Sequence, residues 1–273
     1  MPATTAPTET QAPTEATAPT ATPLPRTTAP LPDRTSSELP LPVVRWLEVA
    51  WPTGTDEVES IELRGPLRIR RNRLWMPGDG TMRFQLGVGY VSDLRIGLGP
   101  LTAIRGLDAY VDGTGVTRVG RQTDTGHEID QGAFLALWAQ SLLFPTAWAR
   151  LPGLRWLAVD DTRALVALPF ARGTETAFVH FDPNASAFPV AFEADRYKVV
   201  GGSKVRWRAD YGEWHWRDGL ALPTRMVVTW AGDAGPWFDM RIESITPNAE
   251  VVPQFDRARE VIAAVREARR PPA

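Results

Sequence analysis

The sequence predicts a mainly β (α+β) protein: a curved antiparallel sheet, or half-barrel, wrapped around a central helix. Apolar and charged residues alternate strictly over 205–211 and 238–243, and this period of two places one strand face in a core and the other in water. Burial of one face is typical of antiparallel sheets. A helical pattern interrupts the strands once, at 131–144, without βαβ alternation. A short helix is expected before the strands and an amphipathic helix after them.

Residues 1–38 consist mainly of Thr, Ala and Pro, with almost no large apolar side chains to offset the entropy of ordering. We predict a disordered Pro/Thr/Ala-rich linker there. Two interpretations stay open: a linker that follows a membrane anchor or lipidated cysteine absent from this chain, or a plain disordered tail. The opening MPATTAPTET lacks the basic start and apolar core of a signal peptide. Residues 39–250 are then a single β-rich half-barrel domain, and 251–273 a C-terminal amphipathic helix.

The folded part opens with a helical pattern, LPLPVVRWLEVAWP, at 39–52. Pro42 suits a first helical turn, and Pro52 ends the pattern. Alternating segments separated by turn residues follow. Strands are expected at about 58–64, 66–71, 81–90, 93–98, 101–111 and 115–119, with turns at Pro77–Gly80 and Asp112–Gly113.

The apolar stretch QGAFLALWAQSLLF at 131–144 predicts the central helix, with Asp130 as its N-cap. Phe134, Trp138 and Leu142 recur at every fourth residue and share one face, which we expect to pack on the sheet. The stretch is too short to cross a bilayer. Strands resume at about 154–159, 162–168, 175–182, 187–200, 204–217, 223–231 and 236–246. A final amphipathic helix at roughly 253–269 turns Phe255, Ala258, Val261, Ile262 and Val265 inward.

Composition argues against several classes of protein. The net charge of −2 argues against charge-driven binding of nucleic acid, and no nucleic-acid partner is predicted. The absence of cysteine removes disulfides, thiolate metal sites and cysteine nucleophiles. The three histidines lack metal-ligand spacing, so neither a metal nor a cofactor is predicted.

Eleven tryptophans are the strongest candidates for contacts with a ligand. A half-barrel has an inner face that sheet packing alone does not fill, so aromatic side chains can line an apolar cavity there. The alternative is an aromatic-rich core without a ligand. The candidate ligand-binding residues are Trp138, Trp207, Trp214, Trp216, Trp230, Trp237 and Phe238.

Polar candidates are fewer. His127 and Glu128 precede the central helix, where they could form an acid/base pair, or where the carboxylate could accept helix N-terminal amides. Asp160 and its neighbour Asp161 end a strand; paired carboxylates serve glycosidases only across a cleft, and aspartates in a turn usually bend the backbone. We favour the structural interpretation for all of them and keep His127, Glu128 and Asp160 as a possible polar site.

Several motifs together carry a resemblance: LPLPVVRWL, LRGPLRIRR, LDAYVDGTG, LFPTAW at 143–148, and LPTRMVVTW. They are similar to a bacterial envelope family of unknown function, over about residues 39–248. The LFPTAW block is the most specific, with Leu143 where the family pattern has tryptophan. This resemblance implies no activity. More loosely, the strands ending in MRIESI resemble LolA/LolB-like lipoprotein-carrier half-barrels, which hold acyl chains against a curved sheet; that similarity is one of architecture.

The favoured hypothesis is a non-enzymatic, extracytoplasmic, envelope-associated binding domain that holds an apolar small molecule or lipid-like ligand in a half-barrel cavity. A membrane tether would lie in a segment absent from this chain. Two alternatives stay open. One is a hydrolase with carboxylate and histidine chemistry at the barrel mouth, and the other is a tethered structural or interaction module.

Overall fold

The computed structural model describes residues 39–50, 58–98, 101–143, 145, 148, 153–171, 173–184, 187–217 and 220–268. The expected linker at 1–38 lies outside the described residues, as does much of the LFPTAW block.

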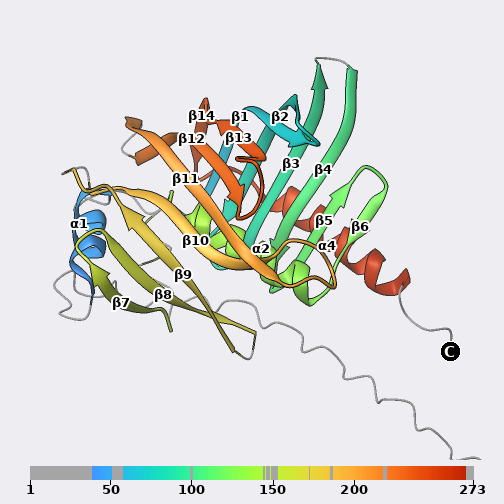
Figure 1. Cartoon of the computed structure of the whole chain (residues 1–273). Helices are drawn as coiled ribbons and strands as arrows, with labels where there is room; N and C mark the ends of the chain where they lie inside the picture. Colours follow the sequence, from blue (N-terminus) through green and yellow to red (C-terminus); the bar gives the residue numbers. More distant parts are fainter. Residues whose placement is uncertain are drawn as a thin grey trace, which may run out of the picture.

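Fourteen strands within the described part of the chain form one curved antiparallel sheet that does not close into a barrel (Figure 1). The order across the sheet is β6-β5-β4-β3-β2-β1-β13-β12-β11-β10-β9-β8-β7, and β14 pairs with β1. The strands are β1 (Ser60–Arg71), β2 (Leu74–Gln85), β3 (Gly89–Leu98), β4 (Leu101–Val111), β5 (Thr114–Val119), β6 (Gln122–Asp124), β7 (Arg155–Asp160), β8 (Arg163–Phe170), β9 (Gly173–Phe181), β10 (Pro189–Tyr197), β11 (Lys204–Arg217), β12 (Leu220–Trp230), β13 (Phe238–Arg241) and β14 (Ser244–Pro247). The predicted mainly β half-barrel is confirmed.

The chain builds this sheet as two meanders. The first runs outward from β1 to the edge strand β6, and the chain then passes through the helix α2 to the opposite edge at β7. The second meander returns from β7 to β12, and β13 joins the two halves by pairing with both β12 and β1. The connection between the meanders therefore has to cross one face of the sheet, and it carries the helix α2.

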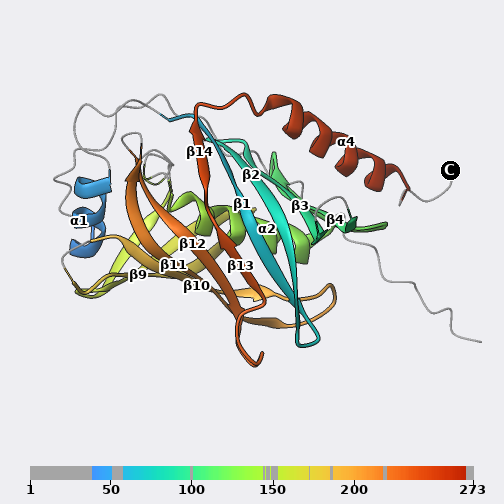
Figure 2. The same cartoon turned by 90° about the horizontal axis from the view of Figure 1, so that it is seen from above.

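The helix α2 (His127–Ser141) occupies the concave face and contacts β4, β5 and β10 (Figure 2). Every residue of Gln131–Ser141 is buried, because the helix is enclosed on all sides. The three residues of the predicted face, Phe134, Trp138 and Leu142, are each 1% exposed. The central helix is thus confirmed.

The start of α2 differs from the prediction. The helix begins at His127 with Gly126 as its N-cap, and no side chain makes a capping hydrogen bond. Asp130 is not the N-cap; its carboxylate instead accepts the backbone N–H of Gly115 at 2.7 Å. A tertiary contact between the helix and β5 has replaced the local cap expected from sequence.

The helix α4 (Val252–Ala268) lies on the opposite face of the sheet, over β3, β4 and β5 (Figure 2). Along β4, Tyr110 belongs to the concave core, whereas Ala109 and Val111 belong to a second core with Phe255 and Ile262 of α4. The predicted amphipathic helix is confirmed, although Val261 and Val265 are only half-buried. None of the described helices is long and apolar enough to cross a membrane.

At the other end of the concave face lies α1 (Leu41–Ala50), the predicted N-terminal helix. Its Trp46 is fully buried, with its ring centroid 6.1 Å from that of Phe181 on β9 and 6.1 Å from that of Trp148. This helix therefore extends the concave core towards β8 and β9.

The turn predicted at Pro77–Gly80 is wrong, because β2 runs through it. The chain reverses instead at Asn72 and Arg73, whose φ angles are 59° and 121°. A Cβ on Gly78 would lie 2.2 Å from the carbonyl oxygen of Arg95, so glycine there permits close approach of β3.

Two predicted strands are divided. The segment 81–90 breaks at Gly87, where φ is 74°, and the flanking residues Phe84 and Tyr90 become cross-strand partners with ring centroids 6.1 Å apart. The segment 236–246 is β13 followed by β14, and both pair with β1. The apolar alternation continues on both sides of each break, so the sequence pattern does not reveal where one strand ends and the next begins.

Candidate ligand-binding interior of the half-barrel

A row of aromatic side chains runs along α2 through the concave core. Phe134 of the helix contacts Phe170 on β8, with ring centroids 4.8 Å apart, and Tyr110 on β4 at 5.7 Å. One turn later, Trp138 meets Trp148 edge to face at 4.7 Å. The row supplies a large apolar surface whose edge-to-face pairs are favourable in themselves.

Several indole N–H groups in this interior have no acceptor among the described residues. They are the Nε1 atoms of Trp46, Trp138, Trp148, Trp207 and Trp237, all of which are buried. A buried tryptophan N–H usually finds a hydrogen-bond partner, and leaving it unpaired costs about 1–3 kcal/mol. The interior thus combines an apolar lining with inward-facing donors.

Arg196, near the end of β10, adds a positive charge to the same interior. Its guanidinium carbon lies 5.0 Å from the ring centroid of Trp207 and 5.7 Å from that of Trp230, within cation–π range. Its Nε is buried without a hydrogen-bond partner among the described residues. A Cβ on Gly132 of α2 would lie 2.8 Å from this Nε, so the glycine makes room for the arginine.

Tyr90 and Asp108 form a polar pair beside this arginine. The Tyr90 hydroxyl donates to the Asp108 carboxylate at 2.6 Å, and Thr117 donates to its other oxygen at 2.7 Å. Burial, and then the nearby Asp108 charge, raise the pKa of Tyr90 well above its ordinary value, while the charge of Arg196 acts in the opposite direction. The tyrosine is therefore a neutral hydrogen-bond donor at any physiological pH.

Gln131, fully buried, fixes the first turns of α2 to β10. Its amide nitrogen donates to the carbonyl of Asp195 at 2.9 Å and to Glu175 at 3.1 Å, and its oxygen accepts the N–H of Tyr197 at 3.3 Å. Three hydrogen bonds to neighbouring strands therefore fix the N-terminal end of α2 beside Arg196.

The structure divides the predicted ligand-binding residues into separate groups. Trp207 and Trp230 are register partners on β11 and β12 and flank Arg196, while Trp138 belongs to the row on α2. Trp237 and Phe238 contact each other at the start of β13, with centroids 5.7 Å apart.

Trp214 and Trp216 lie at the far end of β11. Glu213 has a left-handed φ of 57°, and the buried face of the strand changes phase there. Trp214 stacks on Phe188 at 4.8 Å and donates to the carbonyl of Pro189 at 3.0 Å, so its polar group is satisfied. Trp216 is 53% exposed.

The three candidate polar residues do not converge. The His127 ring contacts the rings of Phe170 and Tyr197, and Glu128 accepts the N–H of Gly201 at 3.3 Å. Asp160 lies in the β7–β8 turn, at the opposite end of the strands. Hydrogen bonds from the Arg163 side chain and from the backbone N–H of Thr162 lower the pKa of Asp160 to about 2. It therefore stays ionised and engaged in its turn.

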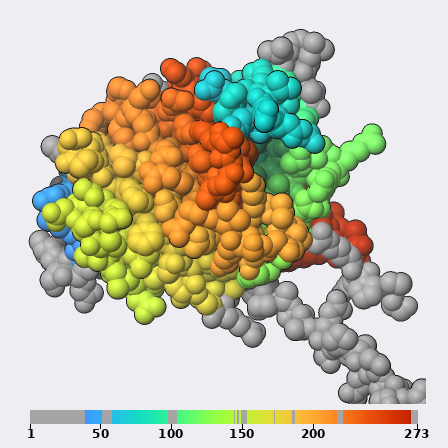
Figure 3. Space-filling view, viewed as in Figure 1, coloured from blue at the N-terminus to red at the C-terminus, as the bar shows by residue number. Residues whose placement is uncertain are grey.

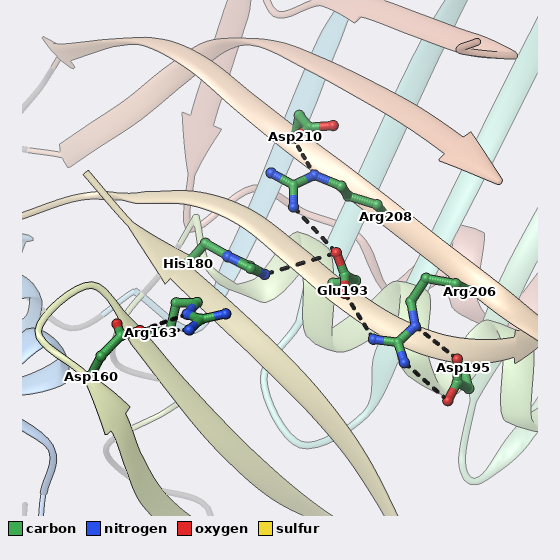
Figure 4. A network of polar contacts seen from close by, with 8 residues as sticks. All are labelled: Asp160, Arg163, His180, Glu193, Asp195, Arg206, Arg208 and Asp210. Carbon is green, nitrogen blue, oxygen red and sulfur yellow. Dashed lines mark hydrogen bonds and ion pairs between the residues drawn. The ribbon is translucent and has the colours of Figure 1, made fainter. Parts of the chain in front are cut away.

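A network of charged residues lies on the outer face of the sheet (Figure 4). Arg206 and Arg208 on β11 both donate to Glu193 on β10, at 2.7 and 3.2 Å. Burial alone would raise the pKa of Glu193, but these two hydrogen bonds outweigh it and lower the pKa. Burial and the neighbouring Arg208 lower the pKa of His180. Because the inward positions of β10 and β11 alternate with these residues, the network faces away from the interior.

Sequence reasoning missed Arg196, although a signal was present. Phe192, Ala194 and Arg196 share one parity along β10, so the arginine stands where an apolar residue is expected. A charged residue at an inward position of an alternating strand is costly and points to a specific role.

The fold and its interior define a class: an open antiparallel half-barrel with an enclosed helix, an aromatic lining and an inward-facing arginine. The chain belongs to a family of unknown function (DUF6544), whose profile matches residues 31–240. No curated protein matches it in sequence.

Several solved structures are similar to this chain, and three of them are compared with it. A DUF1329 family protein from Desulfovibrio piger has a TM-score of 0.45 and 11% identity, over 76% of this chain and 91% of that one. A LolA superfamily protein from Nitrosomonas europaea has a TM-score of 0.45 and 12% identity, over 78% and 95%. A domain named for outer membrane lipoprotein sorting, from Vibrio parahaemolyticus, has a TM-score of 0.41 and 10% identity, over 73% and 89%. The function of the present chain therefore rests on its own residues.

Proposed function

We propose that this protein is a non-enzymatic, extracytoplasmic binding domain that holds an apolar or lipid-like ligand in the half-barrel. The observation that carries the proposal is the chemistry of the concave interior, where an aromatic row coexists with Arg196 and with buried N–H donors that find no acceptor in the described part of the chain. A purely structural core has no need of such donors, because each one is costly when unpaired. The Thr/Ala/Pro-rich composition of residues 1–38, typical of a linker, supports placement as a tethered envelope protein.

The donor groups specify what the ligand would offer. An acyl chain or another apolar body would replace contacts along the row of Phe134 and Trp138, and ester, carboxyl or phosphate oxygens would accept from indole N–H groups and Arg196. Because α2 already occupies the concave face, loading requires the helix or its neighbouring side chains to move. The ligand therefore has to offset the contacts that it displaces.

A tethered structural or interaction module is the second candidate, and a specific observation favours it: the complete burial of Gln131–Ser141 fills the concave face in the described structure. The hydrolase alternative gains no such support, since His127 and Glu128 lie at one end of the strands and Asp160 at the other.

The deciding experiment is native mass spectrometry of protein purified without detergent, followed by titration with a fluorescent fatty acid. We expect a mass shift from a retained apolar molecule, or near one-to-one probe binding that unlabelled fatty acid reverses. Arg196→Gln should weaken binding of the acidic probe, whereas Arg163→Gln, in the outer β7–β8 turn, serves as the control. Folded protein that neither retains an apolar molecule nor binds the probe would leave the interaction module as the function.

A further inference from the structure

Three neighbouring chain reversals form one end of the half-barrel. They comprise residues 68–75 at the β1–β2 hairpin, 198–204 at the β10–β11 hairpin and 231–237 between β12 and β13; we call them the hairpin rim. The three segments are joined: Arg70 donates to the carbonyl of Ala234 at 3.0 Å, and Lys198 pairs with Asp233 at 2.5 Å. Figure 2 shows these reversals projecting on the same side of the molecule.

The hairpin rim exposes large apolar side chains at its tips. Leu74 is 74% exposed, Val199 62% and Val200 54%, and Trp75 beside Leu74 is 37% exposed. Single exposed apolar residues are ordinary on protein surfaces, whereas here four of them lie at the tips of two hairpins that residues 231–237 connect.

The same segments carry an excess of basic residues. They carry four arginines and two lysines against one carboxylate, although the whole chain has a net charge of −2. Three of these cations are ion-paired: Arg68 with Asp239, Lys198 with Asp233 and Lys204 with Glu175. The other three, Arg70, Arg71 and Arg73, have no carboxylate partner among the described residues and supply the unneutralised positive charge of the rim. Both lysines of the chain, Lys198 and Lys204, lie here and bracket the two exposed valines. The guanidinium carbons of Arg68 and Arg70 lie 4.8 and 5.9 Å from the Trp75 ring centroid.

In space-filling view, the outer face of β9–β12 is a continuous surface on which the β12–β13 reversal and the β10–β11 tip lie side by side (Figure 3). The outer face of β10 and β11 carries the ion pairs of Glu193 with Arg206 and Arg208, so the apolar tips adjoin a charged surface. Projecting aliphatic tips flanked by cations match the chemistry of a bilayer surface, where acyl boundary and anionic phosphates lie within a few ångströms of each other.

We propose that the hairpin rim docks on the surface of a bilayer containing anionic lipids. Leu74, Val199 and Val200 would enter the acyl boundary, and Trp75 would lie at the headgroup level. Arg70, Arg71 and Arg73, the cations of the rim without a carboxylate partner among the described residues, would face lipid phosphates. The rim adjoins the N-terminal end of α2 through the contact of Gly201 with Glu128, so docking would bring that end of the half-barrel to the membrane. This inference does not require that a ligand occupy the interior.

The test is flotation of the full chain with phosphatidylcholine vesicles containing about a third phosphatidylglycerol, and with pure phosphatidylcholine vesicles. We expect binding to the anionic vesicles that weakens at high salt. The double variant Val199→Asp/Val200→Asp should bind at least about tenfold more weakly. The matched control is Leu157→Asp/Val159→Asp, which makes the same charge change at residues 54% and 42% exposed on the edge strand β7, and it should bind as the wild type does.

The outcomes are distinct. Wild-type protein that floats with neither kind of vesicle overturns the proposal and leaves the rim as a surface for a protein partner. Equal loss in the rim and control variants overturns the assignment to the rim. The rim variant should still bind the fluorescent fatty acid, because its substitutions lie outside the aromatic interior; failure of rim docking and failure of ligand binding are therefore measured separately.

Discussion

Replacing Trp138 by alanine should cost a large part of the stability of this protein. The side chain is 1% exposed and packs against Trp148 and Phe134, at 4.7 and 6.2 Å between ring centroids. A buried tryptophan removes about 150–250 Å² from water, which at about 25 cal/mol per Å² corresponds to about 4–6 kcal/mol. Partial collapse of the vacated space reduces this amount, so we expect Trp138→Ala to lower the free energy of unfolding by about 3–5 kcal/mol.

The measurement is urea-induced unfolding at 25 °C followed by far-ultraviolet circular dichroism. Circular dichroism reports the sheet as a whole, whereas emission from eleven tryptophans mixes local signals. Trp138→Phe should cost less than Trp138→Ala, because it keeps a ring and removes an unpartnered N–H. Trp216→Ala, at a residue 53% exposed, is the control and should change stability by about 0.5 kcal/mol or less. A loss below about 1 kcal/mol for Trp138→Ala, with an unchanged denaturant slope, would refute the assignment of α2 to the core.

Three further predictions concern the interior, its electrostatics and the N-terminal segment. Gly132→Ala should destabilise the fold and shift Arg196, since the new Cβ would meet the guanidinium at 2.8 Å, whereas Gly173→Ala, with its nearest atom at 3.9 Å, should be tolerated; melting temperatures of the two variants compare them directly. Burial raises the pKa of Asp130, so its ionised form is disfavoured in the folded state. Stability from this group is therefore lost as the pH rises from the ordinary aspartate value through the raised one, and Asp130→Asn should gain on the wild type at neutral pH but not in acid. Equal differences at both pH values would contradict that assignment. Removal of residues 1–38 should leave the melting temperature unchanged, and a clear decrease would show that the segment packs on the domain.

Period-two alternation was sufficient to predict β11, which spans 204–217 as expected, and the four-residue spacing in 131–144 was sufficient to predict that α2 is buried. Both patterns arise because the residues of one face are buried, and burial of one face is what the sequence period reports. The turn expected at Pro77–Gly80 fails for a physical reason. Glycine serves either to reverse a chain or to let two backbones approach, and only the neighbouring strand decides between these uses.

In the candidate site, too, the sequence predicts which residues face inward but not which of them lie together. Tryptophans at inward positions, such as Trp207 and Trp138, could be named from periodicity, but their grouping could not, because it depends on which strands are neighbours. The pairing of β1 with β13 is a contact across most of the chain, and local sequence contains no record of it. Arg196 could have been found as a charged residue on an apolar face, provided that the alternation was followed to the end of β10.

The junction of the two meanders has a consequence for biosynthesis. Arg68 on β1 bonds to Asp239 on β13 across 171 residues. A ribosome that adds about 5–20 residues per second therefore leaves β1 without this partner for roughly 10–30 s. Throughout that interval the nascent first meander presents an open strand edge, the feature through which sheets join foreign chains. Translation that ends before β13 would thus produce a chain whose two meanders both keep an unpaired strand edge, at β1 and at β12, and such a chain would be prone to aggregation.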